Sequence, residues 1–95
     1  IFFVKTIFDD VYNNNRISNL NKALGVNEKL YYIKELFGGD AAKFNDSLNF
    51  FNDAALFDNA RLYMEDKLIE NFGWMSKDKK PVAKEFVKLI RRRYL

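Results

Sequence analysis

The fold is decided by residues 25–51, which read GVNEKLYYIKELFGGDAAKFNDSLNFF. Apolar side chains recur there at intervals of three and four residues, which is the periodicity of helices with one buried face. Asn27 and Asp40 can each cap the first turn of a helix, and Gly38-Gly39 favours a break between the two helices. The residues predicted to face the core are Leu30, Ile33, Leu36 and Phe37 in the first helix and Ala41, Phe44, Leu48 and Phe51 in the second.

Helical signals continue on both sides of this stretch. Downstream, Asp58 is a candidate cap for a helix that ends at Gly73, and Pro81 suits the first turn of a last helix, where a missing amide costs nothing. Upstream, Ser18 is a candidate cap for a short helix that Gly25 would close. The predicted core residues of these helices are Ile17, Leu20 and Leu24, then Leu62, Met64, Leu68, Ile69 and Phe72, and finally Val82, Phe86, Leu89 and Ile90.

These signals predict an all-α fold, because no stretch shows the alternation of a β-strand. We expect a compact bundle or orthogonal array of about five helices. A chain of 95 residues suits a single domain and can bury one core without disulfides. Within this single helical domain, residues 1–95, we distinguish an N-terminal helix at 1–15, which could continue from an upstream region, from a core module at 17–95.

The composition excludes several kinds of catalytic and metal site. The chain has no cysteine and no histidine, so it lacks the thiolate nucleophile, the commonest general base and the commonest metal ligand. Asp66 and Glu70 lie four residues apart on one predicted helix, but a lone carboxylate pair is more typical of a solvated face. We therefore expect no enzyme activity and no cofactor. No apolar run is long enough for a membrane span, and we expect a cytoplasmic protein.

Positive charge is concentrated near the C-terminus. Between Lys77 and Arg93 eight basic side chains stand against two acidic ones, although the whole chain carries only +3. Basic residues near a helix end complement its dipole, so this stretch can be helix termination alone. Alternatively, this stretch binds nucleic acid. Arginines at the C-terminal end of a helix are poorly placed for base readout, so such binding would use phosphate contacts only. The candidate basic patch comprises Lys77, Lys79, Lys80, Lys84, Lys88, Arg91 and Arg92.

A second candidate surface lies at the N-terminus. Residues 1–12 carry apolar side chains at helical spacing, in a band wider than packing against one domain requires. Because a large exposed apolar patch is unusual in a monomer, we expect this segment to pack against the rest of the domain and also to contact either a second copy of the chain or an upstream segment. The alternative is that the domain wraps the helix completely. The candidate interaction surface comprises Ile1, Phe2, Phe3, Val4, Ile7 and Phe8.

Two single residues are predicted to be structural. Trp74 follows the helix-ending Gly73, so we expect it to fold back and fill the core between the last two helices. Arg93 falls within about 20° of Val82 on the helical wheel. It should therefore bury its stem and hold its guanidinium on a carboxylate or on the last carbonyls of a helix. Candidate carboxylates, which the sequence does not rank, are Glu35, Asp40 and Asp46.

Three short motifs carry a family resemblance. They are the stretch from Gly25 to Asp40, Phe72-Gly73-Trp74, and Arg92-Arg93-Tyr94. This combination resembles a C-terminal helical module of uncharacterised, conserved hypothetical proteins of bacteria, of the Bacteroidetes type, over roughly residues 17–95. The resemblance implies a bacterial source, but the module has no known catalytic or ligand residues to carry over.

The sequence leaves two functions open. The first is a non-enzymatic protein-interaction or scaffold domain of unknown role, with a protein partner or self-association. The second is a nucleic-acid-binding domain that uses the basic C-terminal helix. A steep fall of nucleic-acid affinity with salt would favour the second function, and negligible binding at any salt concentration would favour the first.

Overall fold

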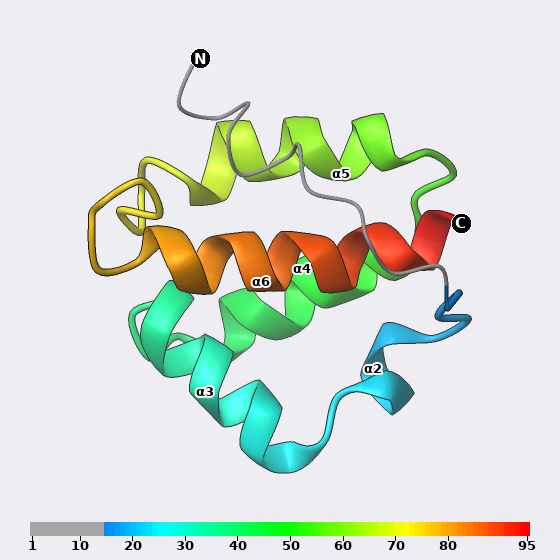
Figure 1. Ribbon diagram of the computed structural model, residues 1–95, viewed down its shortest axis with the longest axis horizontal. Coiled ribbons are helices and arrows are strands. Elements are labelled where there is room, and N and C mark those ends of the chain that lie inside the picture. The colour runs from blue at the N-terminus through cyan, green and yellow to red at the C-terminus, as the bar shows by residue number, and fades with distance from the viewer. Residues whose placement is uncertain (1–14) are drawn as a thin grey trace.

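The computed structural model describes residues 15–95, which contain five α-helices and no strand. In chain order the elements are α2 (Leu20–Ala23), α3 (Val26–Leu36), α4 (Ala41–Asp53), α5 (Phe57–Tyr63), a π-helical turn (Met64–Leu68), α6 (Lys80–Arg91) and a 3-10 turn (Arg92–Tyr94). α6 runs through the middle of the molecule, with α5 along one side and α3 along the other (Figure 1). The expected all-α fold is confirmed. The N-terminal helix expected over residues 1–15 lies, apart from Asn15, outside the described residues.

Two helix starts follow the predicted chemistry. The carboxylate of Asp40 accepts a hydrogen bond from the backbone amide of Lys43 at 2.9 Å, so Asp40 caps α4 as expected. Pro81 occupies the first turn of α6. At α2 the cap is Asn19 instead of Ser18, because the Asn19 side chain reaches the amides of the first turn. Side-chain caps of this kind are local, which is why sequence alone comes within one residue of them.

Two other predicted caps are wrong, and in both places a residue inside the helix reaches back. Gly25 does not close α2; it precedes α3 with an ordinary φ of −72°. The carboxylate of Glu28 accepts from its amide at 3.0 Å, which leaves Asn27 in the first turn and not at the cap. Likewise Asn59, not Asp58, binds the amide that precedes α5, at 3.2 Å.

The core is an aromatic cluster centred on Phe86 of α6. The ring of Phe86 lies within 6.4 Å, between ring centroids, of Phe37, Phe44, Phe51 and Trp74. All five side chains are fully buried. The core therefore brings together the end of α3, α4, the turn after Gly73 and α6. Contacts of Phe86 with the four other rings set the position of α6.

Some predicted core residues are exposed. Leu30 and Leu62 leave 58% and 52% of their surface in solvent, and Ala41 is also exposed. In α3 the buried residues are Leu36, as predicted, and Tyr32, whose ring packs on Phe86 at 4.9 Å. Apolar residues occur all around α3, so its periodicity fits more than one face, and contact with α6 selects the one that is buried.

Trp74 is buried as predicted. Its indole Nε1 donates a hydrogen bond to the carbonyl of Leu36 at 2.8 Å, and its ring contacts Phe37 and Phe86. Leu36 is the last residue of α3, where carbonyls lack partners within the helix. Trp74 therefore joins the end of α3 to α6.

Arg93 holds helix-terminal oxygens, as predicted, but none of the three candidate carboxylates. One of its terminal nitrogens donates to the backbone carbonyl of Asn52 at 2.8 Å, and its Nε donates to the side-chain oxygen of the same residue at 3.3 Å. That side-chain oxygen also accepts the amide of Leu20 at 3.0 Å. Asn52 therefore ties the end of α4 to α2 and to the C-terminus.

Candidate functional site

The seven residues of the candidate basic patch make different contacts in the structure. Lys79 forms an ion pair with Glu35 of α3, with 3.1 Å between Nζ and Oε1. The guanidinium of Arg91 lies 4.5 Å from the ring centroid of Phe57, and Nε of Arg92 donates to the carbonyl of Asn15 at 2.8 Å. These three contacts join parts of the chain that are distant in sequence, so the three cations stabilise the fold.

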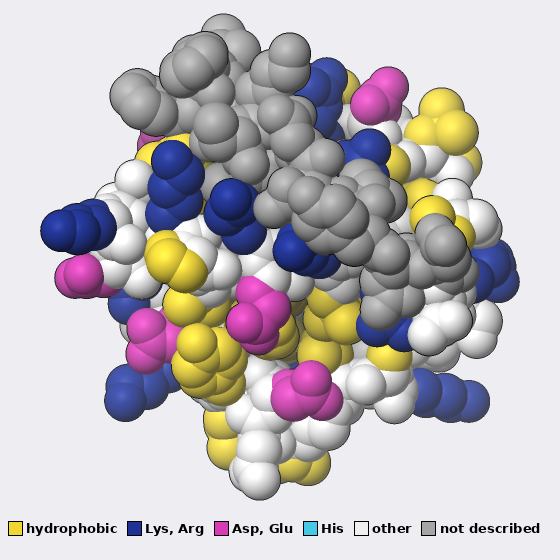
Figure 2. Space-filling view, viewed as in Figure 1, with side chains coloured by type: hydrophobic (Ala, Val, Ile, Leu, Met, Phe, Trp, Pro, Cys, Tyr) yellow, Lys and Arg dark blue, Asp and Glu magenta, His cyan; other side chains and the backbone are white. Residues whose placement is uncertain are grey.

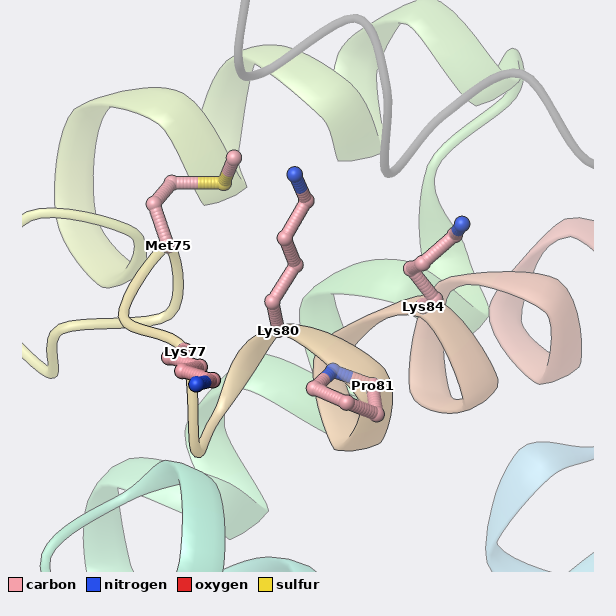
Figure 3. A pocket seen from close by; sticks show the side chains of 5 residues that line it. All are labelled: Met75, Lys77, Lys80, Pro81 and Lys84. Atoms are coloured by element: carbon pink, nitrogen blue, oxygen red, sulfur yellow. The ribbon is translucent and has the colours of Figure 1, made fainter.

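Three other patch residues line one hollow. Lys77, Lys80 and Lys84 surround an open space of about 540 Å³ whose remaining lining is Met75 and Pro81. Figure 3 shows Met75 in the turn before α6, followed by Lys80 and Lys84 on α6, with their side chains extending to the same side. We call these five residues the lysine hollow.

The local sequence builds this hollow in three steps. Gly73 has a φ of +64°, a backbone conformation that glycine adopts without steric cost, and it reverses the chain after the preceding helical turns. Trp74 then enters the core, which leaves Met75 half-buried at the surface. The hydroxyl of Ser76 accepts from the amide of Lys79 at 3.2 Å and starts the turn into α6.

The charge of the hollow is positive. Lys80 and Lys84 are one helical turn apart, so their stems share a face of α6. Within residues 15–95, no ion pair or hydrogen bond engages the ammonium groups of Lys77 and Lys80. The acidic residue beside them in sequence, Asp78, is exposed. Several basic side chains follow the course of α6 on the face in Figure 2, with acidic side chains nearby.

A second, smaller hollow of about 260 Å³ lies between α3 and α6 and has mixed charge. Its lining consists of Glu28, Tyr32, Glu85, Lys88, Leu89 and Arg92. The hydroxyl of Tyr32 donates to Glu85 at 2.9 Å. Burial, and then the hydrogen bond and charge of Glu85, raise the pKa of the Tyr32 hydroxyl well above its ordinary value. Tyr32 therefore stays protonated at neutral pH and acts as a donor that joins α3 to α6.

Sequence reasoning found the three lysines of the hollow but missed its apolar residues, Met75 and Pro81. The available signal was the position of Met75 directly after a buried tryptophan, at a chain reversal. The other candidate surface, residues 1–8, lies outside the described part of the chain. Within residues 15–95, no helix is long and apolar enough to cross a membrane, and no group of three or more acidic side chains is arranged to hold a metal ion.

Comparisons with known proteins identify a family without assigning a function. Neither the curated proteins nor the solved structures contain a match to this chain. A family model, described as a domain of unknown function, matches residues 21–95, nearly the range that the resemblance covers. The match includes all the helices from α3 to α6 and the whole lysine hollow. The chain therefore belongs to the family of the domain of unknown function DUF8457.

Proposed function

We propose that this chain is a non-enzymatic protein-interaction domain that binds its partner at the lysine hollow. The observation that supports this proposal is the combination of two apolar residues, Met75 and Pro81, with three lysines around one open space. The lack of cysteine and histidine in the whole chain supports the non-enzymatic part. A bacterial source, which the resemblance implies, and a cytoplasmic location belong to the same proposal.

The nucleic-acid alternative has less support in the geometry. A phosphate backbone is bound by cations that remain exposed along its path. Here the cations at the end of α6, Arg91, Arg92 and Arg93, contact a ring or backbone oxygens of this chain. Lys79 faces Glu35. The lysines that remain surround one open space and are interleaved with the apolar residues Met75 and Pro81, which suits a protein partner better than an extended polyanion.

Site-specific photo-crosslinking tests the proposal. A photoreactive amino acid replaces Lys77, at the rim of the hollow, in the full chain. A matched control carries it at Leu62, which is 52% exposed on α5 and outside the hollow. Each protein is irradiated in an extract of the cells from which the sequence comes. The proposal predicts a protein adduct at position 77 that disappears when Lys80→Glu and Lys84→Glu are added.

Three results would count against the proposal. Equal adducts at positions 77 and 62 would indicate non-specific contact. An adduct at position 77 that survives both charge reversals would place the partner elsewhere. An adduct that is removed by nuclease treatment would favour the nucleic-acid function instead.

A further inference from the structure

The second hollow, between α3 and α6, is lined by groups of both charges and by an apolar side chain. We call it the mixed-charge hollow; its lining is Glu28, Tyr32, Glu85, Lys88, Leu89 and Arg92. In the region between α3 and α6, Figure 2 shows acidic side chains close to apolar surface. The volume of about 260 Å³ lies just below the range of roughly 300–1,000 Å³ that is usual for drug-sized ligands. The hollow therefore suits a small molecule or a single side chain.

Two carboxylates from different helices form the acidic end of the hollow. Oε1 of Glu85 accepts from the hydroxyl of Tyr32 at 2.9 Å, and Oε1 of Glu28 accepts from the amide of Gly25 at 3.0 Å. Burial, the hydrogen bond and charge of Glu85, and then the charge of Glu28 raise the pKa of the Tyr32 hydroxyl, so both carboxylates act near one point. Within residues 15–95, no hydrogen bond or ion pair engages Oε2 of either carboxylate. One oxygen of each group thus fixes its position, and the other can accept from a ligand.

Arg92 forms the basic end of the hollow. Its Nε donates to the carbonyl of Asn15 at 2.8 Å, whereas its terminal nitrogens make no hydrogen bond or ion pair within residues 15–95. Glu85 and Arg92 are seven residues apart, which is a rise of about 10 Å at nearly the same angle around a helix. Leu89, which is half-buried, lies between them on that face. The hollow therefore offers carboxylates, then apolar surface, then a guanidinium.

We infer that the mixed-charge hollow binds a small ligand that carries an ammonium group at one end and a carboxylate at the other, joined by an apolar chain. The ammonium group pairs with Glu28 and Glu85, the carbon chain lies against Leu89, and the carboxylate binds the terminal nitrogens of Arg92. An ω-amino acid has this chemistry, and so does a lysine at the C-terminus of a protein. The hollow shares no residue with the lysine hollow, so this inference goes beyond the proposed function and can be tested independently of it.

The separation of the charges distinguishes this ligand from simpler ions. A ligand with a single charge would pair with one end of the hollow and leave the other end without a partner. In glycine the ammonium group and the carboxylate are attached to the same carbon atom, which is too short a link for two ends about 10 Å apart along the helix. Each charge and the link between them can therefore be tested separately.

Titration of the full chain with 6-aminohexanoate, followed by the backbone amide signals in two-dimensional NMR, provides the test. We expect saturable shifts concentrated at residues 28–32 and 85–92. Hexanoate lacks the ammonium group and hexylamine lacks the carboxylate. Because a hydrogen bond to a charged group contributes about 1.5–3 kcal/mol, each should bind with a Kd at least about tenfold higher than that of 6-aminohexanoate. Glycine should produce no saturable shift.

Variants of the acidic end complete the test. Glu28→Gln with Glu85→Gln removes both negative charges but keeps an amide oxygen in place of each Oε1 acceptor. It should raise the Kd of 6-aminohexanoate at least about tenfold and abolish the preference for 6-aminohexanoate over hexanoate. The matched control, Asp66→Asn with Glu70→Gln, makes the same change in net charge at two exposed residues outside the hollow. It should leave both the Kd and the preference unchanged.

A variant of the basic end tests the other contact. Arg92→Gln should abolish the preference for 6-aminohexanoate over hexylamine while hexylamine binds as before. Arg61→Gln, at an exposed arginine of α5 outside the hollow, is the control. The NMR spectrum of each variant checks that it is folded. If Arg92→Gln is unfolded, the ligand analogues and the variants of the acidic end still decide the inference.

A further ligand distinguishes the two sources of this chemistry. Nα-acetyl-lysine ends as a C-terminal lysine does, with a free carboxylate and a side-chain ammonium group. Binding as tight as that of 6-aminohexanoate would support a protein C-terminus as the natural ligand, and weaker binding would support a free ω-amino acid.

Three results would overturn the inference. The first is equal binding of 6-aminohexanoate and either single-charge analogue. The second is an equal loss in the variant of the acidic end and its control. The third is an absence of saturable shifts with 6-aminohexanoate, and in that case a crosslink at position 77 would still support the proposed function.

Discussion

Replacing Trp74 with phenylalanine separates one hydrogen bond from the packing around it. The fully buried indole donates to the carbonyl of Leu36 at 2.8 Å, and its ring lies 6.0 Å from Phe37 and 5.8 Å from Phe86. Phenylalanine retains most of the ring packing but has no donor. The Leu36 carbonyl would then stay buried without a partner.

The structure gives different magnitudes for two substitutions. An unpaired buried carbonyl costs about 1–3 kcal/mol, so we expect a loss of that size for Trp74→Phe. Trp74→Ala also leaves a cavity, and large-to-small changes in a core cost about 3–5 kcal/mol. A domain of this size is stable by only about 5–15 kcal/mol in total. The alanine variant should therefore lie close to the limit of folding, and the phenylalanine variant should remain folded.

Urea denaturation followed by far-ultraviolet circular dichroism measures both losses. Tryptophan fluorescence cannot be used, because Trp74 is the single tryptophan of the chain. The control is Leu62→Ala, at a side chain that is 52% exposed, and it should change the free energy of unfolding by no more than about 0.5 kcal/mol. An unchanged midpoint for Trp74→Phe would refute the contribution of the hydrogen bond. A loss below about 1 kcal/mol for Trp74→Ala would refute the core assignment.

Three further predictions concern other contacts. Gly73→Ala should lower the free energy of unfolding by about 1–2 kcal/mol, because φ at Gly73 is +64°. Gly25→Ala, at a φ of −72°, should change it by no more than about 0.5 kcal/mol. Equal losses for the two variants in urea denaturation would contradict this difference. Arg93→Ala should lower the free energy of unfolding by about 1–3 kcal/mol. Arg93→Lys should restore little of this loss, because lysine lacks the planar group that reaches both oxygens of Asn52. Thermal denaturation of the two variants would show whether charge alone restores stability. The pKa of Tyr32 is raised above 10.0, so its contribution to stability is intact below that pH and declines above it, because the unfolded chain loses the proton first. As the pH rises above about 10, the free energy of unfolding should therefore fall more steeply for the wild type than for Tyr32→Phe, and parallel curves would argue against this prediction.

The candidate site was only partly visible in the sequence. Lys77, Lys80 and Lys84 stand out as a basic cluster, but arginines of the same cluster bind Asn52 and Asn15 in the structure. A charge count cannot separate the two groups, because the acceptors are remote in sequence. The contribution of Met75 to the hollow was hidden for the same reason: Met75 lies at the surface only because its neighbour Trp74 enters the core.

The features that the sequence determined by itself are local. The cap at Asp40, the start of α6 around Pro81 and the chain reversal at Gly73 each depend on one residue and its nearest backbone groups. Such interactions form within one or two helical turns, so their signals can be recognised without knowing what packs against the helix. They also make the all-α class predictable.

The predicted residues Phe44, Leu48 and Phe51 of α4 are buried, but only the tertiary structure decided which side of α3 is buried. In α3, Leu30 is exposed and Tyr32 is buried, although both suit a core position. Tyr32 is selected because its hydroxyl binds Glu85 and its ring packs on Phe86, more than fifty residues away in sequence. Both contacts require α6 to lie against α3. When apolar residues surround a helix, its own periodicity leaves the buried face undefined, and the packing partner selects it.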